Sequence, residues 1–199
     1  TSSPVDLRTL NVPDSVILKS KDERVSWLAE AIRAALTERG RYIERQKIFL
    51  IYGRDRTADG TTGLVQSHLE SLGLTVCKGD VASFSNTIPH DLLKLMEPCA
   101  AFVAICTPDD PWEGGKRAPR GNVLYEMGIA VGLQRGLERL IIVQKWGSNA
   151  EEQAVLPSDF GGNVPIRFYT SCENQFPILE ERLKKLRVNI SRAATAKRG

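Results

Sequence analysis

The sequence has few of the residues that build metal centres and disulfide frameworks. Its two histidines, His68 and His90, stand far apart, and its four cysteines show no Cys-X-X-Cys spacing. A zinc site needs several such ligands close together, and a Cys–His nucleophilic pair needs both partners. We therefore expect no metal site and a reduced, intracellular protein.

Long apolar runs and strong charge are also missing. No stretch approaches the length of a membrane span, and Thr1 does not open a signal peptide. The net charge is only +3, and the basic residues after Arg182 fit a solvated helix face followed by a frayed tail. We expect a cytoplasmic protein that contacts neither membrane nor nucleic acid.

Phosphate-binding motifs are absent as well. No Gly-X-Gly-X-X-Gly follows the first apolar run, and Gly114-Gly115-Lys116-Arg117 lacks the spacing and the hydroxyl of a P-loop. These absences argue against a dehydrogenase and against an NTPase.

What the sequence does contain is a regular alternation of short apolar runs and helical stripes. The runs predict buried strands at residues 47–52, 74–77, 100–106 and 140–143, and an edge strand at 165–169. Helices are expected between them, in a final segment that includes Val188 and Ile190, and before Gly40. Residues 146–162 are expected to form a long loop with room for a short helix.

This alternation predicts an α/β fold of the flavodoxin type. We expect a parallel sheet of about five strands in the order 2-1-3-4-5, with helices on both faces. The main domain is predicted to cover residues 46–190, with an arm and flanking helix at 1–45 and a basic tail at 191–199.

Ligands of such folds bind beyond the carboxyl ends of the strands, where the strand order reverses. The loops after the first and third predicted strands should therefore border one crevice. Their side chains suit a nucleotide, with an aromatic ring, a cation and several carboxylates: Tyr52, Arg54 and Asp55 on one side, and Asp109, Asp110, Trp112, Asn122 and Glu126 on the other.

Glu126 has two interpretations on composition alone. A carboxylate in the opening turns of a helix can simply stabilise the helix. Its neighbours Val123, Leu124 and Met127 are apolar, however, and a lone charge there needs a reason. If Glu126 acts, a single carboxylate suits cleavage of an N-glycosidic bond whose leaving group is already cationic, such as nicotinamide in NAD+.

Four motifs in order carry a resemblance to a known family. They are Phe-Leu-Ile-Tyr-Gly-Arg-Asp at 49–55, Cys-Thr-Pro-Asp-Asp at 106–110, the run from Arg117 to Gly128, and Leu-Pro-Ser-Asp-Phe-Gly-Gly at 156–162. Over roughly residues 46–168 the chain resembles the bacterial TIR-like domain of cyclic-nucleotide-triggered antiphage effectors. The resemblance implies a flavodoxin-like TIR fold and NAD+ glycohydrolase activity, with Glu126 at the position of the catalytic glutamate.

The resemblance also implies partners and contacts. NAD+ would be the substrate, with no separate cofactor. The expected substrate-binding residues are Tyr52, Gly53, Arg54, Asp55, Phe84, Asp110, Trp112 and Asn122. Many NAD-cleaving TIR domains have a tryptophan four residues before the glutamate, where this chain has Asn122. The loop from Lys78 to Asn86 is expected to take part in self-association, and a cyclic-nucleotide sensor domain or protein is a possible partner.

Two alternatives stay open. A nucleoside deoxyribosyltransferase-like N-glycosidase presents a comparable glutamate after its third strand. A non-catalytic TIR scaffold would signal by assembly alone, and Glu126 would then be structural.

Overall fold

The computed structural model describes Glu30 and residues 43–53, 60–79, 88–134, 137–160 and 162–191. The chain divides after Ile43, and every helix and strand named below lies in the unit that begins at Glu44. The predicted helix before Gly40 lies outside the described residues, as does nearly all of the predicted arm and basic tail. None of the described helices has the length and hydropathy of a membrane span.

Five parallel strands form one sheet in the predicted order, β2-β1-β3-β6-β7. β1 lies between β2 and β3, and its Phe49 is opposite Cys77 of β2 and Phe102 of β3. All eight residues of β3 are buried, which explains its unbroken apolar sequence. The strands are β1 (Glu44–Ile51), β2 (Thr75–Cys77), β3 (Cys99–Cys106), β6 (Leu140–Lys145) and β7 (Ile166–Phe168).

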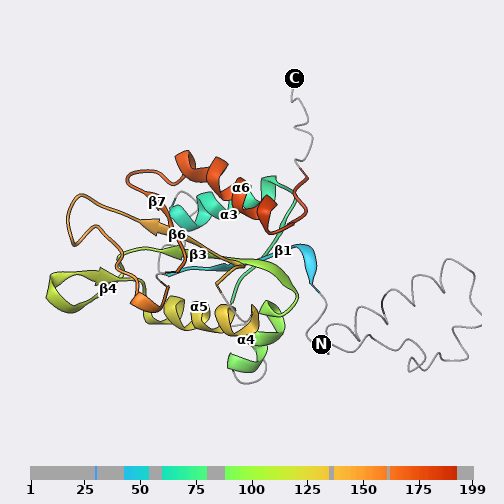
Figure 1. The fold of residues 1–199 in the computed structure, drawn as a ribbon, viewed down its shortest axis with the longest axis horizontal. Helices are drawn as coiled ribbons and strands as arrows, with labels where there is room; N and C mark the ends of the chain where they lie inside the picture. The colour runs from blue at the N-terminus through green and yellow to red at the C-terminus, as the bar shows by residue number, and fades with distance from the viewer. Residues whose placement is uncertain are drawn as a thin grey trace, which may run out of the picture. The chain divides into compact units, whose positions relative to one another are not determined.

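Helices cover both faces of this sheet (Figure 1), which confirms the flavodoxin-like α/β fold. α4 (Ile88–Met96) and α5 (Gly121–Gln134) pack on one face, and α3 (Thr61–Ser71) and α6 (Phe176–Lys185) on the other. Because strand side chains alternate between faces, Phe49 and Ile51 join the core under α4 and α5, together with Met127.

The final helix is shorter than predicted. α6 ends at Lys185, and Val188 and Ile190 belong to the segment that follows. Arg187 adopts a left-handed conformation (φ 57°), and the amide of Val188 donates to Leu183 O at 3.1 Å, so the chain turns away from the helix axis. Val188 is apolar because the turn buries it, not because the helix continues.

The segment after α6 returns to the start of the sheet. The amide of Asn189 donates to Arg45 O at 2.8 Å, and that of Ser191 donates to Leu72 O at 2.9 Å, just after α3. Gly73 ends α3 as predicted, with φ +73°, and a Cβ there would lie 2.3 Å from Ser191 Oγ. This position therefore requires glycine for its conformation and for the close approach.

A small hairpin replaces the polar loop predicted after β3. β4 (Asp110–Pro111) and β5 (Arg117–Ala118) pair antiparallel, around the 3₁₀ turn η3 (Glu113–Gly115), and the hairpin extends past the carboxyl end of the sheet (Figure 1). Two-residue strands are too short to show an alternating pattern, so the sequence did not predict them. The long loop after β6 does hold a short helix, the 3₁₀ turn η4 (Ser158–Phe160).

Candidate functional site

The loops that follow β1 and β3 touch at Gly53. A Cβ on Gly53 would lie 1.9 Å from Asp109 Oδ2, so only glycine lets the two loops approach this closely. The Asp109 carboxylate also accepts a hydrogen bond from Thr107 Oγ1 at 3.0 Å. Gly53 and Asp109 therefore lie together as predicted, and Asp109 joins the two loops.

Arg117 holds the loop after β3 in place. Its Nε donates to Pro108 O and its Nη2 to Asp109 O, both at 2.7 Å. The amide of Asp109 in turn donates to Ala118 O at 3.0 Å. Arg117 opens one of the motifs noted in the sequence, but its role depends on tertiary contacts that the sequence did not reveal.

Glu126 lies on α5, over the carboxyl end of β1 and beside the residues that follow β2. Its Oε1 is 3.5 Å from the position that a Cβ on Gly79 would take. The same position is 3.3 Å from Leu92 Cδ1 and 3.7 Å from Phe49 Cζ. The carboxylate is thus placed among α4, β1 and the start of the loop after β2, and a Cβ at residue 79 would be in van der Waals contact with it.

The environment of Glu126 is unusual for a carboxylate. Burial raises its pKa from 4.5 to about 7, because an apolar surrounding disfavours the charged form. α5 begins at Gly121, and its first turn has no acidic residue. The helix dipole acts mainly within the first turn. Ordinary helix stabilisation therefore does not explain Glu126, and the fold holds a carboxylate at some cost in free energy.

The other predicted contact residues take several places. Tyr52 follows β1, half-buried, with Lys78 Nζ 5.9 Å from its ring centroid. Asn122 is exposed one helical turn before Glu126, so the two share one side of α5. Asp110 is half-buried at the start of the hairpin, and the Trp112 side chain is 45% exposed on it.

Some candidates cannot be placed. Arg54, Asp55 and Phe84 lie outside the described residues. Lys78 and Gly79, which the sequence analysis did not include among the contact residues, stand close to Tyr52 and Glu126 respectively. The signal for them was their position directly after a predicted strand.

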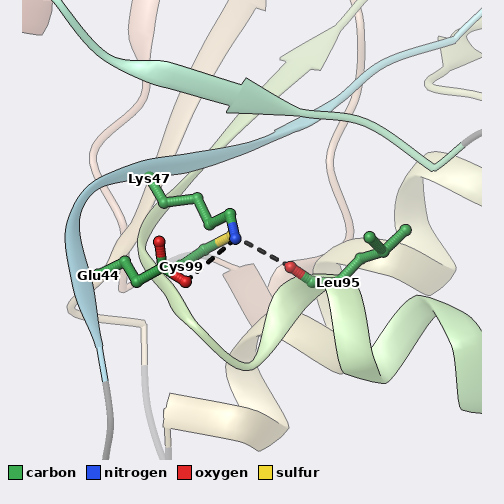
Figure 2. A network of polar contacts seen from close by, with 4 residues as sticks. All are labelled: Glu44, Lys47, Leu95 and Cys99. Carbon is green, nitrogen blue, oxygen red and sulfur yellow. Dashed lines mark hydrogen bonds and ion pairs between the residues drawn. The ribbon is translucent and has the colours of Figure 1, made fainter. Parts of the chain in front are cut away.

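A pair of thiols lies in two of the strands, with Cys77 as the last residue of β2 and Cys99 as the first residue of β3. Cys99 Sγ donates to Leu95 O at 3.2 Å, and the ammonium of the neighbouring Lys47 donates to Glu44 Oε1 at 3.2 Å (Figure 2). The Lys47 charge also acts on Cys77. A hydrogen bond with Cys99 lowers the pKa of Cys77 to about 7, with help from the Lys47 charge and against the effect of burial. The same hydrogen bond, together with burial, raises the pKa of Cys99.

The described residues contain no group of three or more side chains suited to holding a metal ion. What they provide is one desolvated carboxylate at the carboxyl end of a parallel sheet. The Lys78 ammonium lies over the Tyr52 ring and donates to Gln66 Oε1 of α3 at 2.9 Å. Two cavities of about 360 and 300 Å³ lie elsewhere, along β6 and its neighbours.

Comparison with known proteins gives two matches. Residues 47–170 match the model of the family described as CAP12/Pycsar effector protein, TIR domain. The chain is also 33% identical over 92 residues to the Pycsar effector protein PaPycTIR of Pseudomonas aeruginosa, an alignment that covers 44% of this chain and 28% of the relative. The family match begins inside β1 and includes Glu126 and β7. The chain therefore belongs to the TIR-domain family of CAP12/Pycsar effector proteins.

Proposed function

We propose that this TIR domain is an NAD+ glycohydrolase that cleaves the bond between nicotinamide and ribose. The observation that supports this most is the isolated Glu126 carboxylate, buried enough to raise its pKa to about 7 and placed beside the strand ends. Membership of an effector family adds to it.

The chemistry needs one carboxylate and no acid. When the bond between C1′ and the pyridinium nitrogen breaks, both electrons go to the nitrogen and nicotinamide leaves neutral. Positive charge develops on C1′ and the ring oxygen, where the Glu126 carboxylate would stabilise it. Water then adds to C1′, and its proton passes to Glu126, whose pKa near 7 suits a general base, to give ADP-ribose.

The full chain, incubated with NAD+ and followed by chromatography of nicotinamide and ADP-ribose, tests this proposal. We expect Glu126→Gln to lower the rate by at least about a hundredfold, because the amide neither stabilises the cation nor accepts the proton. Glu113→Gln, an exposed change on the hairpin, is the matched control and should keep full activity. Equal nicotinamide release by Glu126→Gln and the unchanged protein would rule out the catalytic role.

The assay should cover a range of protein concentrations. Self-association through TIR contacts is part of the proposal, and it predicts a rate that rises more steeply than the protein concentration. A strictly linear dependence would argue against activation by assembly while leaving the chemistry intact.

Two further outcomes separate the alternatives. Cleavage of deoxynucleosides in place of NAD+ would identify a deoxyribosyltransferase-like enzyme. No turnover at any concentration would favour a scaffold that signals by assembly. In the proposed role, the domain would act in an antiphage or cell-death response, in the cytoplasm, downstream of a cyclic-nucleotide sensor domain or protein.

A further inference from the structure

A second cavity, of about 300 Å³, lies at the β6–β7 edge beneath the loop that joins these strands. The glycohydrolase mechanism proposed for Glu126 does not involve the residues that line this cavity. Its volume is at the lower end of small-molecule sites, enough for one nucleotide-sized group. The hydrogen-bonding side chains in its lining are Gln144, Gln153, Ser158, Asn163 and Arg167.

Gln144 is the buried polar group of this cavity. Its side chain is only 3% exposed, and its Nε2 donates to Ala154 O at 2.6 Å. That bond fixes which end of the amide is the acceptor. Within the described part of the chain, Oε1 accepts no hydrogen bond. This oxygen has almost no accessible surface, so a ligand in the cavity does not reach it. Gln144 instead holds the loop at Ala154 against β6, which fixes the wall of the cavity.

The cavity also has a cation, Arg167, which lies beside Gln144 on the next strand. Arg167 on β7 is opposite Gln144 in the strand register, and it is exposed. Its guanidinium carbon lies 3.8 Å from the ring centroid of Trp146. Stacking fixes the plane of a guanidinium and leaves its N–H edge free for a phosphate. The stacked pair thus provides an ordered anion-binding group at the edge of the cavity.

The rest of the lining is neutral. Gln153 and Ser158 can form hydrogen bonds, while Pro157 and Phe160 offer flat apolar surface. Among the described lining residues Arg167 is the single charged group. The cavity therefore favours a ligand with a flat ring and a negative charge.

We propose that this cavity binds a nucleotide, with its phosphate on Arg167 beside the Trp146 ring. The base packs against the aromatic and proline side chains of the loop. The loop also links the two sites, because the amide of Val155 donates to Arg117 O at 2.8 Å, and Arg117 holds the loop after β3.

The same chemistry has two sources. The nucleotide is either the adenylate half of NAD+ or a separate, free nucleotide. The first source rests on the proposed glycohydrolase function, and the second does not. Binding of AMP tests the site without any catalysis, so failure of one proposal is distinguishable from failure of the other.

Titration of AMP into the full chain, with NMR of the tryptophan indole N–H signals, is the direct experiment. The chain has three tryptophans, and Trp146→Phe assigns the relevant signal. We expect a saturable shift at Trp146 and little change at Trp112 on the hairpin. No saturable shift, or a shift confined to Trp112, would overturn the proposal.

Variants at the exposed rim test the contacts without disturbing the core. Arg167→Ala should weaken AMP binding about tenfold, because a charge-assisted bond to the phosphate is lost. Ser158→Trp should block the cavity, and Lys184→Ala, a charge-matched change on α6, should have no effect. AMP binding that is unchanged in both Arg167→Ala and Ser158→Trp would contradict the site.

Kinetics with Ser158→Trp separates the two sources. If the cavity holds the adenylate half of the substrate, KM for NAD+ rises, while cleavage of nicotinamide mononucleotide, which lacks that half, is unchanged. If it holds a free nucleotide, KM for NAD+ stays the same and AMP binding is still lost. Each result supports nucleotide binding and assigns its source.

Discussion

Replacing Glu126 with glutamine should remove the loss of stability that this carboxyl causes as the pH rises, in addition to removing the proposed catalytic group. The folded protein holds this carboxyl with a pKa of about 7, against an ordinary value of 4.5. Between these values the folded state binds more protons than the unfolded state. Stability from this group is therefore complete below pH 4.5 and is lost as the pH rises through 7.

The size of the effect follows from the same two values. One pKa unit corresponds to about 1.4 kcal/mol, so the full difference is about 3 kcal/mol. Between a pH of about 5 and about 8, the linkage relation gives a loss of about 2.5 kcal/mol in the unchanged protein. Glu126→Gln removes the ionisation and with it this loss. Burying the amide has its own cost, but that cost is the same at both pH values and cancels in the comparison.

Urea unfolding at the two pH values, for the unchanged protein and for Glu126→Gln, measures this difference. Glu113→Gln is the control, because it makes the same chemical change at an exposed position on the hairpin. If the unchanged protein and Glu126→Gln lose stability in parallel as the pH rises, the carboxylate is not desolvated. The explanation offered here for its raised pKa would then be wrong.

Three further results are expected. The kcat/KM for nicotinamide release should rise with pH around a midpoint near 7, since the carboxylate of Glu126 is the active form, whereas a midpoint near 4.5 would contradict its burial. Iodoacetamide at neutral pH should modify Cys77 well before Cys99, as peptide mass spectrometry would show, and equal rates would exclude a lowered pKa at Cys77. Gly53→Ala should cost about 1–3 kcal/mol, because its Cβ would meet the Asp109 carboxylate. The control Gly128→Ala, which has open space in α5, should be neutral or stabilising, and thermal unfolding that shows equal losses would refute the contact.

The sheet was predictable because its central strands β3 and β6, and the second half of β1, are buried on both faces. Continuous apolar runs such as that of β3 leave a clear signal, and the spacing between them sets the alternation of helices and strands. The end of α6 was not predictable from periodicity. Val188 is as apolar as a helical core position would be, and only the left-handed conformation at Arg187 shows that the helix has already ended.

The candidate site divides in a similar way. Glu126 stands out in the sequence as a charge among apolar residues, and that contrast survives in the structure as a raised pKa. Its neighbour Gly79 comes from a distant strand end, and Arg117 acts through backbone carbonyls that any sequence would provide. Contacts of this kind depend on tertiary geometry, so they cannot be predicted from residue type alone.

The return of the chain after α6 has a consequence for larger proteins that contain this domain. Because Asn189 pairs with Arg45, the points where the polypeptide enters and leaves the sheet are neighbours. Both lie at the amino end of β1, opposite the strand ends beside Glu126. A domain of this construction can be joined to other modules at either terminus, or inserted into a loop of another protein, without covering the strand ends beside Glu126.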